Sequence, residues 1–242
     1  MLVHSSPDPS PAKLVLNEST LAENTAFVPI KNELTAGYGG AIFVARNVEL
    51  TVQGCRATSN TVEGDAGTKS QTMAGGFTST CSSARVTLSD SHFVANQARL
   101  STGTVRAVDS ASISSCEITS AFGGAVYVVA QDLKDDAGLV LCSFIVDEYA
   151  LLRIARSSFM RNLAGRDLQG LKKFKAAGGA IHSETHSAFL IVVEDSDISE
   201  NRAVGGNAEG GAVWSDSRRL SIRSTVMRSN TARAFGGSSD SQ

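Results

Sequence analysis

The chain has 242 residues, of which 42% are hydrophobic and only 19% are charged. This composition excludes a coiled coil, which needs about half of its residues from Ala, Glu, Lys, Leu and Arg, and it is too apolar for a disordered protein. The net charge of -2 gives no reason to expect nucleic acid as a partner. No apolar run reaches the roughly 18 residues of a membrane-spanning helix, so we expect no transmembrane segment.

Residues 1–13 contain Ser, Pro and Asp and lack the basic and apolar regions of a secretory signal. We expect this segment to be disordered or to be the start of a fragment. From Leu14 onward, a spaced pattern of apolar residues begins and recurs along nearly the whole chain.

Each copy of the pattern has apolar residues at offsets 0, 2 and 7, with a small residue at offset 5. Seven copies begin at residues 14, 50, 86, 111, 152, 191 and 220. Six of them carry Asn at offset 10, namely Asn24, Asn60, Asn96, Asn162, Asn201 and Asn230. The fourth copy has Ala121 there instead, so we expect it to be the weakest.

A Gly-Gly pair precedes most copies, at residues 39–40, 75–76, 123–124, 178–179 and 210–211. Alternating apolar residues predict short strands, whereas the Gly pairs and the Asn predict turns. Each unit is therefore expected to hold three strands: one after the Gly pair, one at the first two apolar positions, and one leading to the Asn. We interpret residues 131–149 as an insertion loop and residues 238–242 as a disordered tail.

A unit of this size cannot bury its own inward face, but stacked units can, with equivalent strands paired in parallel. The predicted fold is all-β: a single-stranded parallel β-helix over residues 14–237, with about seven coils of three short strands. The general preference of parallel crossovers makes it right-handed. Because Asn tolerates left-handed backbone and stacked Asn side chains can bond to one another, the six Asn are predicted to form a structural ladder at turns.

The Gly-Gly-Ala-Ile/Val sequences at residues 39, 123, 178 and 210, with Phe-x-x-Asn at Phe93–Asn96 and Phe159–Asn162, resemble the repeats of chlamydial polymorphic outer-membrane proteins. More broadly, they are similar to β-helix proteins of the pectate-lyase-like superfamily. The resemblance implies an extracellular or cell-surface, non-catalytic segment of adhesin or passenger type, with a host, matrix or glycan ligand. We expect the chain to be a fragment of a longer repeat array.

The same superfamily includes polysaccharide lyases and hydrolases, so a carbohydrate-active enzyme or glycan-binding domain is the alternative. Such enzymes need carboxylates that converge on a sugar, or a carboxylate-bound cation beside a basic group. The residues that follow the Gly-Gly-Ala-Ile/Val motifs on the outer face are instead Phe43, Tyr127, His182 and Trp214. No catalytic residue is assigned. These four form a candidate strip for stacking sugar rings or a partner protein, unless they only stack on one another and cover the sheet.

The four cysteines, at residues 55, 81, 116 and 142, show no Cys-x-x-Cys spacing, so no zinc site is predicted, and no other metal or cofactor is expected. Cys55 and Cys116 occupy a repeat position that serine holds elsewhere, which favours stacking of small side chains. Two coils apart, at roughly 10 Å, they lie beyond the reach of a disulfide. A bridge that involves Cys81 or Cys142 stays open.

Overall fold

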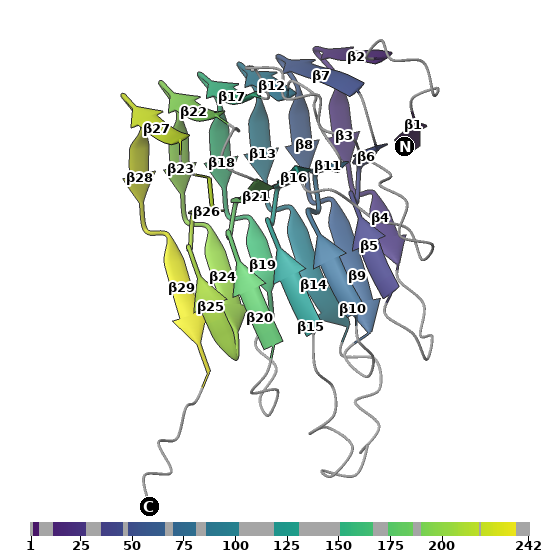
Figure 1. The fold of residues 1–242 in the computed structure, drawn as a ribbon, viewed down its shortest axis with the longest axis vertical. Coiled ribbons are helices and arrows are strands. Elements are labelled where there is room, and N and C mark those ends of the chain that lie inside the picture. The colour runs from purple at the N-terminus through teal and green to yellow at the C-terminus, as the bar shows by residue number, and fades with distance from the viewer. Residues whose placement is uncertain are drawn as a thin grey trace, which may run out of the picture.

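The computed structural model describes residues 2–4, 12–27, 35–45, 48–65, 70–80, 86–101, 119–130, 151–166, 174–185, 190–217 and 219–235. All regular structure in these residues is β-strand, and paired strands run parallel in five sheets (Figure 1). Successive strands belong to successive sheets, so every fifth strand returns to the same sheet. The all-β prediction is confirmed, and the stacked parallel strands are consistent with a β-helix.

The five sheets are named A to E here. Sheet A comprises β1 (Leu2–His4), β6 (Ile42–Ala45), β11 (Phe77–Thr80), β16 (Val126–Ala130), β21 (Ile181–Thr185) and β26 (Val213–Ser215). Sheet B comprises β2 (Ala12–Asn17), β7 (Val48–Gln53), β12 (Val86–Ser89), β17 (Leu151–Ala155), β22 (Leu190–Glu194) and β27 (Arg219–Arg223). Sheet C comprises β3 (Thr20–Ala22), β8 (Arg56–Thr58), β13 (His92–Val94), β18 (Ser158–Met160), β23 (Asp197–Ser199) and β28 (Val226–Arg228).

Sheet D comprises β4 (Thr25–Phe27), β9 (Thr61–Asp65), β14 (Gln97–Ser101), β19 (Leu163–Gly165), β24 (Arg202–Gly205) and β29 (Thr231–Ala234). Sheet E comprises β5 (Thr35–Tyr38), β10 (Ser70–Met73), β15 (Thr119–Phe122), β20 (Phe174–Ala177) and β25 (Asn207–Glu209). The three strands predicted for each unit are those of sheets A, B and C. The predicted number of strands per unit is therefore wrong, because sheets D and E add two more. Those strands escape a search for large apolar residues because their inward positions are mostly alanine, as at Ala98, Ala176 and Ala203.

In sheet B no strand lies between the third and fifth copies of the pattern. Strand β12 pairs directly with β17, so that Val86 lies opposite Leu152. Sheet B consequently has six strands in the described residues, where seven coils were expected. Ala121 lies in sheet E opposite Ala176, so its expected place in the Asn row is wrong. Residues 111–118, 131–149 and 238–242, on which further predictions fall, lie outside the described residues.

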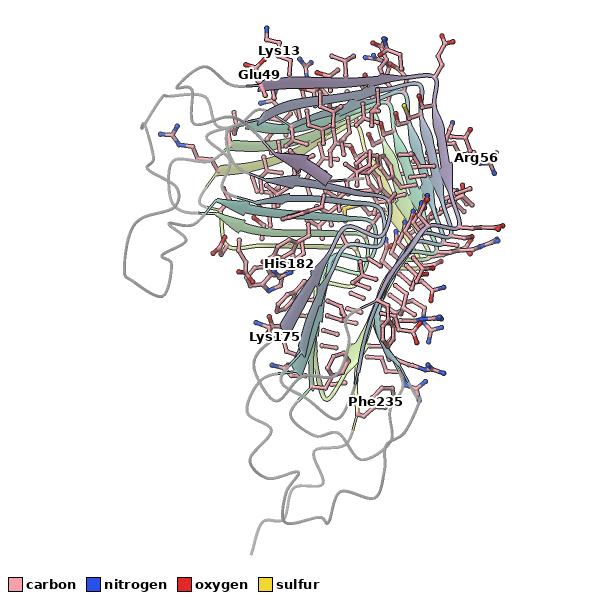
Figure 2. The ribbon with its side chains drawn as sticks, turned by 90° about the vertical axis from the view of Figure 1, so that its right-hand side faces the viewer. Lys13, Glu49, Arg56, Lys175, His182 and Phe235 are labelled. Carbon is pink, nitrogen blue, oxygen red and sulfur yellow. The ribbon has the colours of Figure 1, made fainter. Side chains whose placement is uncertain are left out.

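Two cores hold the sheets together. Sheets A, B and C enclose the larger one, in which the rings of Phe93 and Phe159 stack 4.6 Å apart and nearly parallel. Sheets D and E enclose a second core made of alanines and Phe174. Figure 2 shows a wide body that narrows toward the part carrying Lys175 and Phe235. The small alanine side chains allow sheets D and E to approach closely, which makes this part narrow.

The Asn side chains form a continuous ladder between sheets C and D. The backbone N–H and Nδ2 of Asn96 both donate to Oδ1 of Asn162 at 3.0 Å, and Nδ2 also donates to the carbonyl of Ala57 at 2.9 Å. The same pattern joins Asn24, Asn60, Asn96, Asn162, Asn201 and Asn230 in order. The left-handed residue at this turn is the one before each Asn, as at Ala95 with φ of 55°, so the prediction that Asn itself takes that conformation is wrong.

A second ladder runs between sheets B and C at the predicted position of small residues. The backbone N–H of Cys55 donates to Ser91 Oγ at 3.0 Å, and that of Ser91 donates to Ser157 Oγ at 3.2 Å. Cys55 is a buried free thiol within this row. The other three cysteines lie outside the described residues. Cys55 therefore occupies a structural position that serine also fills.

The Gly pairs form the turn from sheet E to sheet A. Gly178 has φ of 64°, and a Cβ on it would overlap the carbonyl of Ile181. Gly179 has no such φ, but its Cβ would overlap the carbonyl of Gly211 and the backbone of Arg202. The first Gly of the pair thus adopts the left-handed backbone conformation that the turn requires. The second leaves room for this turn to lie against the start of β24 in sheet D.

Candidate functional site

The four residues of the predicted strip lie in one row across sheet A. Tyr127 is opposite His182 in the pairing of β16 with β21, and His182 is opposite Trp214 of β26. Phe43 is opposite Thr78 of β11, which is in turn opposite Tyr127. Three strip residues are therefore direct neighbours, and a threonine separates Phe43 from them.

The rings of this row stack along the sheet. The centroids of Tyr127 and His182 lie 5.2 Å apart, and those of His182 and Trp214 lie 4.3 Å apart with an interplanar angle of 5°. Phe122, at the end of β15 in sheet E, stacks on His182 at 4.4 Å and on Tyr127 at 6.0 Å. We refer to Phe122, Tyr127, His182 and Trp214 as the corner cluster, because it joins the outer faces of sheets A and E.

The sequence reasoning missed Phe122. In the sequence, Phe122 is marked only by its place directly before the Gly pair at residues 123–124. That place indicates a position beside the strip only when a strand of sheet E is known to end there. Figure 2 shows His182 outside the wide body, where the body meets the narrow part. The corner cluster therefore depends on sheet E, which the sequence pattern did not predict.

Burial divides the strip into two kinds of residue. His182 is 0% exposed, Tyr127 is 3% exposed and Phe122 is 7% exposed, so these rings are packed like core side chains. Phe43 and Trp214 are only partly buried. Ring surface available to a ligand on this strip is thus confined to Phe43 and Trp214.

The buried imidazole of His182 is hydrogen-bonded on one side only. Its Nε2 lies 3.0 Å from Oε1 of Glu184, and the hydroxyl of Tyr127 donates to Oε2 of the same carboxylate at 3.4 Å. Nδ1 of His182 is buried and has no hydrogen-bond partner among the described residues. This arrangement fits the neutral tautomer in which Nε2–H donates to Glu184.

Burial lowers the pKa of His182, and its hydrogen bond to Glu184 only partly offsets that effect. Burial would raise the pKa of Glu184, but its hydrogen bond to His182, the nearby charge of Lys175 and its hydrogen bond to Tyr127 bring that pKa below the usual value. The pair is therefore a neutral imidazole that donates to an ionised carboxylate.

Charged side chains surround the partly exposed ring of Trp214. Lys175 Nζ lies 5.1 Å from the ring centroid, within the range of a cation–π contact, and 3.3 Å from Oε2 of Glu209. Asp216 and Glu184 both raise the pKa of His182 through their charges, while Lys175 lowers it. Within the described part of the chain, one ammonium and three carboxylates thus lie near the stacked rings of His182 and Trp214.

An aromatic face with polar groups at its rim can bind a sugar ring or an amphipathic side chain of a partner protein. Among the described residues, no group of three His, Cys, Asp or Glu side chains could hold a metal ion. That part of the chain also contains no helix of the length and apolarity that a membrane span requires.

Comparison of the chain with protein-family models, with curated proteins and with solved structures gives no match. We therefore infer function from the geometry of the corner cluster and the charged residues around it.

Proposed function

We propose that this chain is a non-catalytic segment of a right-handed parallel β-helix and that it acts as a scaffold of adhesin or passenger type, outside the cell or at its surface. In this role it resembles the repeats of chlamydial polymorphic outer-membrane proteins. The stacked sheets supply a rigid support, and the partly exposed residues Trp214 and Phe43 supply the adhesive surface for a glycan or for a host or matrix protein.

The complete burial of His182 is the observation that carries the non-catalytic assignment. A general acid or base must come within hydrogen-bond reach of its substrate. His182 is 0% exposed and is covered by Phe122, Tyr127 and Trp214. Its hydrogen bond goes to Glu184, whose other oxygen accepts from Tyr127. The His182 imidazole therefore holds the strip in shape and is covered from any substrate.

The charges around Trp214 favour a neutral or basic ligand over a polyanion. Among the described residues, the carboxylates of Glu184, Glu209 and Asp216 accompany the ammonium of Lys175. A uronic acid polymer that stacked on the ring would meet more acidic than basic groups from this part of the chain, which opposes binding. Neutral oligosaccharides are therefore the first ligands to test.

Trp214 is the only tryptophan of the chain, so its fluorescence reports directly on this surface. We expect neutral oligosaccharides to change its emission in a saturable manner. Lys175→Ala is expected to weaken that binding, because it removes the cation beside the ring. Arg56→Ala provides the matched control, since Arg56 is an exposed basic residue of β8 in sheet C and is far from His182 (Figure 2).

A glycan array tests the same surface without fluorescence. Trp214→Ala should lose the signal that the unaltered chain gives, while Arg56→Ala keeps it. If the unaltered chain binds no glycan and no matrix protein on such arrays, the proposed adhesive surface is wrong. Equal binding by Trp214→Ala and the unaltered chain would also contradict it.

A carbohydrate-active enzyme is the second candidate because of one feature, the presence of Glu184, Asp216 and Lys175 near His182, with Lys175 also over the ring of Trp214. Carboxylates with a nearby basic group are the residue types that lyases and hydrolases need. Incubation with pectin, alginate and hyaluronan tests it, with absorbance of unsaturated products for a lyase and new reducing ends for a hydrolase. Product that depends on Glu184 would favour the enzyme over the scaffold.

A further inference from the structure

The turn from sheet B to sheet C repeats one hydrogen bond. Oγ of Ser19 donates to the carbonyl of Asn17, two residues earlier, at 2.8 Å. The hydroxyls of later turns donate in the same way at 2.7 or 2.8 Å, namely those of Ser91, Ser157, Ser196 and Thr225. The repeat therefore places a small polar side chain two residues after the end of each strand of sheet B.

Asn17 gives the first of these turns an additional property. Residues 17–19 read Asn-Glu-Ser, which is the Asn-x-Ser acceptor sequence of N-linked glycosylation without a proline at its centre. The other strands of sheet B end in Gln, Ser, Ala, Glu or Arg. Among the asparagines of the chain, only Asn17 has serine or threonine two residues later. The repeat thus supplies the hydroxyl, and a single turn adds the asparagine.

The asparagines of the ladder are unsuited to the same modification. Two residues after each of them comes an inward residue of sheet D, always alanine or valine, as at Val62 and Ala98. Asn60 and Asn96 are also fully buried, and their side-chain amides donate within the ladder. The ladder and the acceptor sequence therefore use asparagines at different corners of the stack.

The side chain of Asn17 lies on the outer face of sheet B. Burial alternates along β2, so that Leu14 and Leu16 pack on the larger core while Asn17 is exposed. This exposure does not depend on an uncovered end, because Gln53 is exposed although it is paired with both Asn17 and Ser89. An N-linked glycan is bulky and must project into solvent, which this position allows.

The outer face of sheet B also lies away from the corner cluster. Lys13 shares the exposed face of β2 with Asn17. Figure 2 shows Lys13 and His182 on opposite sides of the wide body. A glycan on Asn17 would therefore leave the row of Phe43 and Trp214 uncovered.

We propose that Asn17 is a site of N-linked glycosylation. This inference rests on the proposed location outside the cell, because the modification takes place in the secretory pathway. The amide nitrogen of Asn17 forms a bond to the anomeric carbon of an oligosaccharide carried on a lipid diphosphate. The bond from that carbon to the diphosphate oxygen breaks, the lipid diphosphate leaves with the electron pair, and the amide loses one proton. The glycan then covers part of sheet B and directs partners to other faces.

Expression of the 242-residue chain behind a secretion signal in eukaryotic cells tests the proposal. We expect a single N-linked glycan, which peptide N-glycosidase removes to leave an aspartate at position 17 that peptide mass mapping locates. Asn17→Gln should abolish the glycan. Asn24→Gln is the matched control, because Asn24 is exposed in the same turn but has Ala26 two residues later.

The membrane fraction of the cells is scored together with the medium, so that a variant that folds poorly is still measured. A chain without carbohydrate at Asn17 in both fractions would overturn the proposal. A glycan that persists in Asn17→Gln would overturn it as well.

Substitutions of Ser19 separate the acceptor role from the hydrogen bond of the turn. Ser19→Ala removes the hydroxyl and should abolish the glycan, whereas Ser19→Thr keeps the hydroxyl and should keep the glycan. A purely structural role of Ser19 would change stability but not the occupancy of Asn17. Equal occupancy in Ser19→Ala and the unaltered chain would therefore refute the assignment.

The glycan array separates this inference from the proposed adhesive surface. Enzymatic removal of the glycan should leave binding at Trp214 unchanged, because Asn17 and the corner cluster lie on different faces. A glycosylated chain that binds nothing on the arrays would contradict the adhesive surface and support Asn17 as the acceptor. A chain that binds but carries no carbohydrate would overturn the acceptor alone.

Discussion

Replacement of Asn96 by leucine gives the sharpest test of the Asn ladder. Asn96 is 0% exposed, and its side chain makes four hydrogen bonds. It donates to the carbonyl of Ala57 and to Oδ1 of Asn162, and it accepts from the backbone N–H and Nδ2 of Asn60. Leucine has a similar size but can make none of these bonds, so the packing is kept while the ladder is cut.

The expected cost follows from the groups left behind. The two donors of Asn60 lose their acceptor inside the protein, and each buried unsatisfied group costs about 1–3 kcal/mol. Burial of the leucine side chain recovers part of this, about 1–2 kcal/mol. Asn96→Leu should therefore lower the free energy of unfolding by about 3 kcal/mol.

Asn24→Leu is the matched control. Asn24 is exposed, and its side chain donates one hydrogen bond, to Oδ1 of Asn60 at 2.7 Å. We expect a loss of about 1 kcal/mol or less. Urea denaturation of both variants gives the free energies, provided that the slope against urea concentration is unchanged. Equal losses in the two variants would refute the view that the ladder stabilises the stack through its buried hydrogen bonds.

Three further predictions concern other parts of the repeat. Gly179→Ala should lower the free energy of unfolding by more than about 3 kcal/mol, because a Cβ there overlaps backbone atoms. Gly54→Ala should lower it by about 1 kcal/mol, because Gly54 has φ of 62° but space around it. Urea denaturation of the two variants gives the comparison. Burial lowers the pKa of His182 below 6.5, so in mild acid the unfolded chain takes up a proton that the folded chain does not. Thermal stability should therefore decrease as the pH falls below about 6.5. His182→Phe should make that decrease smaller. Cys55→Ser should change the melting temperature little. Cys55→Val should lower it, because the backbone N–H of Ser19 loses its acceptor, the Sγ at 3.4 Å. A larger decrease in melting temperature with serine than with valine would contradict the ladder role of Cys55.

Large inward residues made much of the fold predictable. Leu88, Phe93 and Ile154 are at fixed offsets and lie in the larger core, so the sequence identifies sheets B and C and the Asn ladder between them. Sheets D and E could not be found in the same way. Their inward alanines, such as Ala98 and Ala176, do not stand out in a chain that also places alanine at exposed positions such as Ala22.

The fourth copy shows why spacing alone misleads. The apolar residues from Ala111 to Ile118 match the pattern, yet β12 and β17 are directly paired, which leaves no place in sheet B for a strand between them. Offsets describe the order of side chains along one segment and carry no information about its neighbours in space. Only the pairing between turns shows that no strand of sheet B lies between β12 and β17.

The strip was predictable as a row but not as a buried cluster. Its register follows from the Gly-Gly motif, because the same turn precedes Tyr127, His182 and Trp214. Its burial depends on Phe122 from sheet E. Sequence therefore located the residues, and the missing sheet decided which of them can meet a ligand.

The turn and the strip are linked by the first glycine of each pair. A Cβ on Gly178 would lie 2.9 Å from Cβ of His182, and one on Gly210 would lie 3.0 Å from Cβ of Trp214. In the second unit the equivalent left-handed residue is Ala74, with φ of 47°, and the row there holds Thr78 instead of a ring.

An aromatic residue in the row thus coincides with glycine at the turn, where an added Cβ would crowd both the turn backbone and the Cβ of His182 or Trp214. Gly210→Ala should displace the ring of Trp214 and change its fluorescence emission, although Trp214 itself is retained. Gly54→Ala, at a left-handed turn away from the strip, should leave the emission unchanged. An unaltered emission in a folded Gly210→Ala variant would show that the glycine serves the backbone turn alone.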